Sequence, residues 1–166
     1  MRIGITGTPC TGKTTIAKKI GKTFDYEIIS LTDFVKENKF WVEYDKERDT
    51  YIIDEEKVLD RLIKILKEKK DNYIVEGHFL DLIPSEFFDI IFVFRTPIKM
   101  LRERLEKRNY PKKKIEENIE AEIMEICLTD ALYEYGPEKV VIINTGKTVE
   151  EVLIEIEKRI SKLKGD

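Results

Sequence analysis

One short string near the amino end constrains this chain more than any other feature of its sequence. Residues Gly7 to Thr14 read GTPCTGKT and match the pattern G-x-x-x-x-G-K-[ST]. The string follows an apolar run at residues 2–6 and precedes an amphipathic segment at residues 13–22, which is the strand, loop and helix order that the pattern requires. Backbone amides in such a loop wrap a phosphate, and Gly7 and Gly12 allow close approaches that a Cβ would obstruct. We therefore predict a phosphate-binding loop.

Each polar side chain of this loop has an expected role. Lys13 is expected to neutralise the β- and γ-phosphate oxygens, and Thr14 to offer its hydroxyl to Mg²⁺, which prefers oxygen ligands. Thr15 is a candidate for a contact to the α-phosphate. Cys10 could be mistaken for a nucleophile, but no His and Asn constellation accompanies it, so we interpret it as a loop residue that contributes its amide.

The rest of the chain alternates between β-branched runs and segments of helical periodicity. Apolar runs predict five strands, at residues 2–6, 26–30, 73–77, 89–94 and 139–144. Amphipathic segments predict helices at residues 13–22, 54–70, 97–108, 111–134 and 148–163. Several runs are continuously apolar, as in parallel strands that helices cover on both faces. We therefore expect an α/β P-loop NTPase fold, with a parallel five-stranded sheet between two layers of helices.

Length and composition exclude several classes of protein. The 166 residues suit one domain at roughly 150 residues each. A net charge of −3 offers no excess of positive charge, so direct nucleic-acid binding is not expected. No apolar run approaches the ~18 residues of a membrane span and the start lacks the features of a signal peptide, which favours a cytoplasmic protein without a membrane partner. The charged fraction of 38%, against a typical ~25%, together with the lack of Gln is a pattern found in thermophile proteins.

Two further features separate the classes of P-loop protein. The chain has neither an Asn-Lys-x-Asp guanine reader nor an Asp-x-x-Gly switch after the third strand, where Glu76-Gly77-His78 stands instead. A carboxylate at the end of the strand beside the loop suits a magnesium-bound water, so Glu76 is the candidate acid, with Thr14, for the metal. Arginines cluster after the fourth strand, where four of the eight in the chain fall within 14 residues: Arg95, Arg102, Arg104 and Arg108. Guanidinium groups suit a transferring phosphoryl group, although a solvated helix face is the alternative reading.

These residues together resemble one known family. The matching segments are Gly7 to Thr15, Tyr51 to Val58, Glu76-Gly77-His78, Phe92 to Thr96, Arg104 to Tyr110, and Asn118 to Ile123. Together they resemble the adenylate kinase isoenzyme 6 family, also called CINAP, over nearly the whole chain. The motifs after the loop are the specific part, since ordinary adenylate kinases lack this His.

The resemblance implies a nucleoside-monophosphate-kinase fold with one domain over residues 1–166. It implies a monophosphate-binding insertion at about residues 30–53 and a short lid at about residues 107–117. The implied ATP contacts lie in the loop, in the lid and after the last strand, at Cys10, Gly12, Lys13, Thr14, Thr15, Arg108 and Lys147. It also implies phosphoryl transfer from ATP to AMP, giving ADP, an accompanying ATPase activity, and a role in small ribosomal subunit maturation through a ribosomal protein partner.

The acceptor side of the site departs from the family pattern. Candidates for AMP contacts are Asp33, Lys36, Trp41 and Tyr44. The insertion has a single arginine, Arg48, and Lys36 stands where many relatives carry Arg, which weakens a bidentate grip on phosphate. Glu76 is one methylene longer than the Asp usual in the family, so it suits contact with the metal through water.

Several alternatives stay open at this stage. We expect Lys13 and Arg108 to act on the phosphoryl group, while His78 either orients the attacking group or is a core histidine satisfied by a backbone carbonyl. The aromatics around Trp41 could face a base, face a protein, or form a small satellite core. Lys112 to Lys114 could touch RNA but more often form a solvated face. The competing function is an ATP-driven ribosome assembly factor whose kinase activity is incidental; a helicase fragment has little support, because one domain offers no second motor half.

Overall fold

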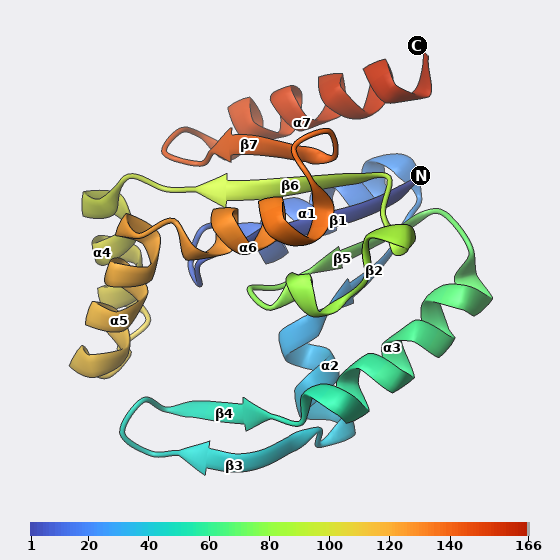
Figure 1. Cartoon of the computed structure of the whole chain (residues 1–166). Coiled ribbons are helices and arrows are strands. Elements are labelled where there is room, and N and C mark those ends of the chain that lie inside the picture. Colours follow the sequence, from blue (N-terminus) through green and yellow to red (C-terminus); the bar gives the residue numbers. More distant parts are fainter. Residues whose placement is uncertain (166) are drawn as a thin grey trace.

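The main sheet confirms the predicted fold class. The computed structural model describes residues 1–165, and its five-stranded sheet is parallel with the order β2–β5–β1–β6–β7. Its strands are β1 (Arg2–Gly7), β2 (Glu27–Ser30), β5 (Tyr73–Glu76), β6 (Ile90–Arg95) and β7 (Val140–Asn144). Each coincides with one of the five apolar runs (Figure 1).

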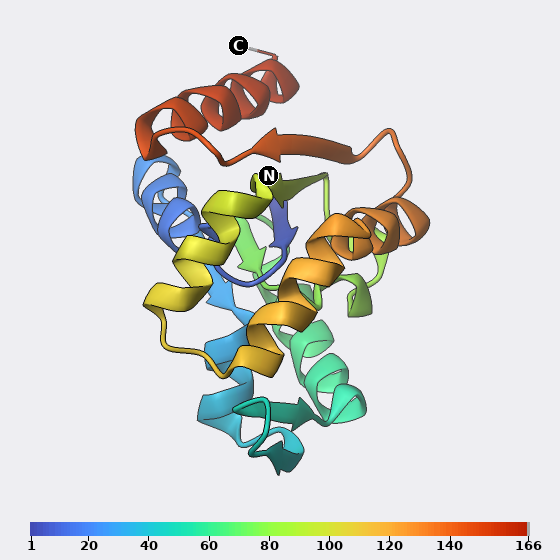
Figure 2. The ribbon, with the colours of Figure 1, turned by 90° about the vertical axis from the view of Figure 1, so that its left-hand side faces the viewer.

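Helices cover both faces of this sheet, as expected. The covering helices are α1 (Lys13–Phe24) and α7 (Val149–Lys164) on one face, and α3 (Glu55–Lys69) and α6 (Ile126–Tyr135) on the other (Figures 1 and 2). Successive strand residues alternate between these layers. In β6, Phe92 packs in the core beneath α1 and α7, whereas Val93 packs in the core beneath α3 and α6. Both faces are apolar for this reason, which explains the continuous apolar runs.

The strand register brings the functional segments to one edge of the sheet. Ile5 of β1 lies opposite Glu76 of β5, and Gly7 lies opposite Phe94 of β6. The carboxyl ends of parallel strands therefore meet at this edge, where ligands of open α/β sheets bind. Helices α4 (Ile98–Lys107) and α5 (Lys112–Ile123) stand beside the same edge, at the left of Figure 1.

The prediction of one helix over residues 111–134 is wrong. The segment forms α5 and α6, and Glu125 between them has a left-handed backbone with φ 57°. The two halves pack on different partners. Ile115 and Ile119 of α5 contact the α4 core cluster, whereas α6 packs on the main sheet. The chain must turn between these surfaces, and hydrophobic periodicity alone does not reveal that turn.

The segment between β2 and α3 has a structure that periodicity did not reveal. It forms helix α2 (Leu31–Asn38) and an antiparallel hairpin of β3 (Trp41–Asp45) and β4 (Thr50–Ile53). This hairpin is a separate two-stranded sheet that projects below the main sheet in Figure 1. Its turn, residues 46–49, reaches toward α5 and supplies contacts described below.

Helix ends follow the expected capping chemistry. The side chain of Asp54 accepts a hydrogen bond from the Lys57 backbone N–H at the start of α3, 3.3 Å away. Thr148 and Glu151 form a reciprocal capping box at the start of α7. Within residues 1–165, none of the helices combines the length and the apolar character that crossing a membrane requires.

Candidate active site

The phosphate-binding loop has a backbone that its residue types explain. A Cβ on Gly7 would lie 2.8 Å from the Phe94 carbonyl oxygen, so a larger residue would collide with β6. Gly12 has φ +95°, a conformation that favours glycine. Cys10 is left-handed as well, with φ 71°, and the hydroxyl of Thr11 donates to the Thr8 carbonyl oxygen at 2.8 Å. The loop is thus held open as a cradle between β1 and α1.

Lys13 is folded over this cradle. Its Nζ donates to the carbonyl oxygens of Gly7 at 2.8 Å and Thr8 at 3.0 Å, and the residue is only 8% exposed. Burial lowers the pKa of Lys13, while the nearby carboxylate of Glu76 acts in the opposite direction. Because its present partners are neutral carbonyls, the ammonium group would gain a charged partner from a polyphosphate.

Thr14 and Glu76 lie together as the sequence predicted. The Thr14 hydroxyl donates to Glu76 Oε1 at 2.8 Å, and Glu76 is 3% exposed at the end of β5. A hydroxyl and a carboxylate are the hard oxygen donors that suit Mg²⁺. Within residues 1–165 there is no group of three or more His, Cys, Asp or Glu side chains that could hold a metal ion. The pair therefore fits a magnesium ion that takes its remaining oxygens from water and phosphate.

His78 lies at the sheet edge two residues beyond Glu76, and its side chain is exposed. The alternative of a core histidine is therefore wrong. Despite this exposure, loss of hydration beside the surrounding protein and, after it, the positive charges of Lys13 and Lys114 together lower the pKa of His78 to about 4. The pKa lies below the ordinary value near 6.5, so the ring is neutral at pH 7 and does not alternate between charge states there.

This shift predicts how His78 affects the pH profile of turnover. Between about pH 5.5 and 8, the profiles of the wild-type protein and His78→Gln are expected to have the same shape, because the ring is uncharged throughout that range. The measurement is the turnover number against pH at saturating substrates, with circular dichroism as the fold control. An inflection near pH ~6.5 in the wild-type profile that disappears in His78→Gln would contradict the lowered pKa.

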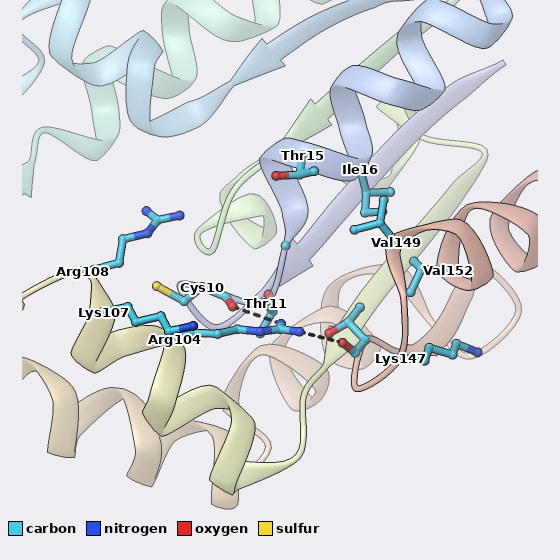
Figure 3. Close-up of a pocket in the computed structure, with 12 residues that line it drawn as sticks. Cys10, Thr11, Thr15, Ile16, Arg104, Lys107, Arg108, Lys147, Val149 and Val152 are labelled. Carbon is cyan, nitrogen blue, oxygen red and sulfur yellow. Dashed lines mark hydrogen bonds between the residues drawn. The ribbon is translucent and has the colours of Figure 1, made fainter.

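A cavity of about 410 Å³ opens beside the loop (Figure 3). Its lining comes from the loop and α1, from α4, and from the segment after β7: Cys10, Thr11, Gly12, Thr15, Ile16, Arg104, Lys107, Arg108, Thr145, Lys147, Val149 and Val152. Ile16, Val149 and Val152 supply apolar surface, while Arg104, Lys107 and Arg108 supply positive charge. A flat apolar ring with an attached chain of phosphates suits such a lining.

The arginine cluster divides into separate roles. Arg104 donates to the carbonyl oxygens of Thr145 at 3.0 Å and Cys10 at 3.4 Å, which joins α4 to the loop and to the end of β7 (Figure 3). Arg108 ends α4 and lies on the cavity wall near Cys10. Arg102 pairs with Glu116 on the exposed surface, 2.6 Å away. The alternative of a solvated helix face therefore describes Arg102.

Lys147 lines the same cavity, but its ammonium group is already engaged. Its Nζ donates to Glu155 of α7, and the side chain points away from the loop in Figure 3. A nucleotide in this cavity would therefore contact the aliphatic part of Lys147, unless the side chain changes its rotamer and brings the ammonium group to the nucleotide.

A buried carboxylate that we did not single out from the sequence connects this edge of the sheet. Glu122 of α5 is 1% exposed and accepts from the Thr8 hydroxyl at 3.0 Å and from the Thr96 backbone N–H at 2.9 Å. The guanidinium of Arg95 lies beside the same carboxylate, 3.3 Å from Nε to Oε2. Glu122 therefore joins α5, β6 and the loop. The spacing from Ile115 and Ile119 places it on the apolar face of α5, a signal that could have identified it.

The acceptor candidates lie on α2 and the hairpin. Asp33 and Lys36 are exposed on α2. Trp41 is half-buried against the core and lies 4.6 Å, centroid to centroid, from Tyr51, while Tyr44 is exposed and donates to Asp49. The packing of Trp41 against the core is consistent with the interpretation that the aromatics of this segment form a small satellite core. The rest of the Trp41 ring remains exposed.

Arg48 is held by carboxylates. It contacts Asp45 at 2.7 Å within the hairpin and Glu117 of α5 at 2.9 Å. A second pair, Lys113 with Glu47 at 2.9 Å, also joins α5 to the hairpin turn. The hairpin turn and α5 are thus in direct contact, and the guanidinium of Arg48 is committed to that junction.

Known proteins resemble this arrangement. A family model described as an AAA domain matches residues 3–125. The adenylate kinase isoenzyme 6 homolog of Schizosaccharomyces pombe is 43% identical over 148 residues, which cover 89% of this chain and 83% of that protein. The homolog of Dictyostelium discoideum is 40% identical over 137 residues, covering 82% and 77%. Shikimate kinase from Bacteroides thetaiotaomicron shares the fold, with a TM-score of 0.69 at 17% identity over 97% of this chain and 98% of its own.

Proposed function

This chain belongs to the adenylate kinase isoenzyme 6 family, and from that membership we propose that it transfers the terminal phosphoryl group of ATP to AMP. Kinase-type chemistry follows from the relatives; the choice of AMP as acceptor is the proposal. The observation that carries it is the Lys13 cradle beside the cavity of about 410 Å³, because the cradle suits a triphosphate and the cavity suits its base and sugar.

The donor nucleotide would lie with its phosphates in the loop and its base in the cavity. Loop amides, Lys13 and Thr15 would hold the phosphates. Thr14 and Glu76 would hold Mg²⁺, Glu76 through water, and the ion supplies charge neutralisation on the β- and γ-phosphate oxygens. Arg108 would approach the γ-phosphoryl group from the end of α4.

The reaction needs positioning and charge more than covalent chemistry from the protein. An oxygen of the AMP phosphate attacks the γ-phosphorus in line, and the bond to the bridging oxygen of ADP breaks, so that two ADP result. Lys13 and Arg108 stabilise charge on the transferring group. His78, neutral at pH 7, can orient a nearby oxygen by hydrogen bonding but does not supply a positive charge.

We propose that two segments close the site. Residues 30–53, with α2 and the hairpin, form the acceptor clamp, and residues 107–117 form a short lid. Asp33, Lys36, Trp41 and Tyr44 are the clamp candidates. The contacts between α5 and the hairpin turn support a closed cleft, since they bridge the two segments above the sheet edge.

We further propose that water can replace the acceptor, which gives an accompanying ATPase activity. This step differs from kinase transfer only in the attacking oxygen. A link to small ribosomal subunit maturation, through a small-subunit ribosomal protein in the cytoplasm, rests on the family resemblance alone. ATP hydrolysis together with such a partner would make the protein an ATP-driven assembly factor, which is the competing function.

Nucleotide analysis after incubation with ATP and Mg²⁺ tests the proposed function. With AMP present, we expect one AMP to be consumed for each ATP. We also expect ADP to form at least about tenfold faster than without AMP, because water in the site is not positioned for attack as a bound acceptor is. CMP and GMP are the acceptor controls. ADP formation that is unaffected by AMP, with one phosphate released per ATP, would contradict the kinase proposal, and acceleration by a ribosomal protein would then favour the assembly factor.

A further inference from the structure

The three lysines at the start of α5 are not equivalent. Lys112 and Lys113 are exposed, and Lys113 pairs with Glu47 at 2.9 Å. Lys114 is half-buried, and within residues 1–165 no carboxylate lies within 4.0 Å of its ammonium group. Surface lysines usually remain solvated or paired. Lys114 is therefore the member of this cluster that a solvated face does not explain.

Lys114 reaches from α5 to the hairpin turn. Its Nζ donates to the Asp49 carbonyl oxygen at 3.1 Å and lies 4.0 Å from the centre of the Tyr110 ring. The first contact reaches the hairpin turn and the second reaches the segment before α5. An ammonium group has three N–H donors, so donors remain for a further partner.

The charge of Lys114 interacts with charged groups in several neighbouring segments. Burial lowers the pKa of Lys114; the neighbouring Asp49 and Cys10 act in the opposite direction, and Lys36 lowers it further. The same ammonium group contributes to lowering the pKa of His78. Lys114 thus lies within electrostatic range of α2, the hairpin turn, the phosphate loop and the end of β5. These are the segments between which an acceptor phosphate would lie.

Apart from Lys36 and Lys114, the cations near this position are already paired or border the donor loop, so they are not available to bind the acceptor phosphate. Arg48 is engaged by Asp45 and Glu117, and Lys13 and Arg108 border the donor loop and its cavity. Lys36 of α2 is exposed, its positive charge contributes to lowering the pKa of Lys114, and neither lysine has a carboxylate within 4.0 Å in the described part of the chain. A dianionic phosphate between two ammonium groups would remove their repulsion and use their free donors.

We propose that Lys114 is a phosphate-binding residue for the acceptor nucleotide and that it acts with Lys36 across the cleft. This inference rests on the proposed kinase function and assigns one more contact to it. The sequence weakened the case for a bidentate arginine grip, and the proposed site binds the phosphate through two lysines from different segments. A lysine ammonium group binds phosphate as a point charge and not as a bidentate fork. Two flexible lysine side chains can therefore bind it without a fixed orientation.

Steady-state kinetics of Lys114→Met test this assignment, with Lys64→Met, at an exposed position of α3 outside the proposed site, as the matched control. Methionine keeps the stem that packs near Tyr110 and removes the charge. We expect the KM for AMP to rise by about tenfold or more in Lys114→Met, because a charge-assisted hydrogen bond to phosphate is lost, while the KM for ATP stays within about twofold. Lys64→Met is expected to leave both constants within about twofold, and Lys114→Arg is expected to restore most of the AMP affinity.

A second measurement follows AMP binding without turnover. Trp41 is the only tryptophan and lies in the hairpin, so its fluorescence reports AMP titrations of each variant. Unchanged AMP affinity in a folded Lys114→Met protein with AMP-dependent wild-type activity would overturn this assignment alone. A loss confined to ATP affinity would move Lys114 to the donor site and overturn it as well. A wild-type protein without AMP-dependent activity would overturn the proposed function instead.

Discussion

Replacing Lys13 by methionine is expected to lower the turnover number by about a thousandfold or more. The ammonium group is held by two carbonyl oxygens of the loop, and in the proposed reaction it would neutralise charge on the transferring phosphoryl group. A thousandfold loss corresponds to about 4 kcal/mol of transition-state stabilisation, within the range of single charged groups at phosphoryl-transfer sites. The measurement is ADP formation at saturating ATP and AMP.

The fold should survive this substitution. Methionine has a similar stem, and the Thr8 carbonyl oxygen keeps its hydrogen bond from the Thr11 hydroxyl, 2.8 Å away. Lys18→Met, an exposed position on the same helix, is the matched control and is expected to retain wild-type turnover. Turnover of Lys13→Met within about tenfold of the wild type would remove the loop from the chemistry and the proposed function with it.

Replacing Glu122 by alanine is expected to lower the free energy of unfolding by about 3 kcal/mol or more. The buried carboxylate accepts hydrogen bonds from Thr8 and Thr96 and lies beside Arg95. Alanine leaves these donors buried without an acceptor, and the loss of one partner from a buried ionic contact costs about 3–5 kcal/mol. For a chain of this length the melting temperature should fall by roughly 10 °C.

Two variants separate the causes of this loss. Glu122→Gln keeps an oxygen acceptor for the Thr96 N–H and removes the charge, so its melting temperature should lie between those of the wild type and Glu122→Ala. Glu120→Ala changes an exposed residue of the same helix and should stay within about 0.5 kcal/mol of the wild type. Thermal unfolding followed by circular dichroism distinguishes the three. Equal stability of Glu122→Ala and Glu120→Ala would contradict the bridging role.

The predictable part of the fold came from local patterns. The apolar runs located all five main-sheet strands because strands buried on both faces need apolar side chains on both. The loop followed from the glycine spacing, and the position of Glu76 followed from the edge at which parallel strands end. Hydrophobic periodicity did not reveal the break at Glu125 or the hairpin of β3 and β4. Those features depend on which surface each half of a segment packs against.

The candidate site also contains residues that local sequence patterns predict and residues that only tertiary contacts bring together. Short-range chemistry identified Lys13, Thr14 and Glu76, whereas the placement of Glu122 and Arg104 depends on contacts with residues far away in the chain. Arg48 and Lys114 show the difference most clearly. The sequence showed Arg48 as the single arginine of the insertion and grouped Lys114 with its neighbours, but the fold pairs Arg48 with two carboxylates and brings Lys114 to the hairpin turn.

The amino-acid sequence by itself determined the α/β architecture, the phosphate loop and the resemblance to one kinase family. These rest on spacings within a few residues, where backbone geometry fixes what neighbouring side chains can do. Only the tertiary structure decided which cations are paired and which remain available to a ligand. Charge pairing depends on distances of a few ångström between segments that are remote in sequence, and no local pattern encodes those distances.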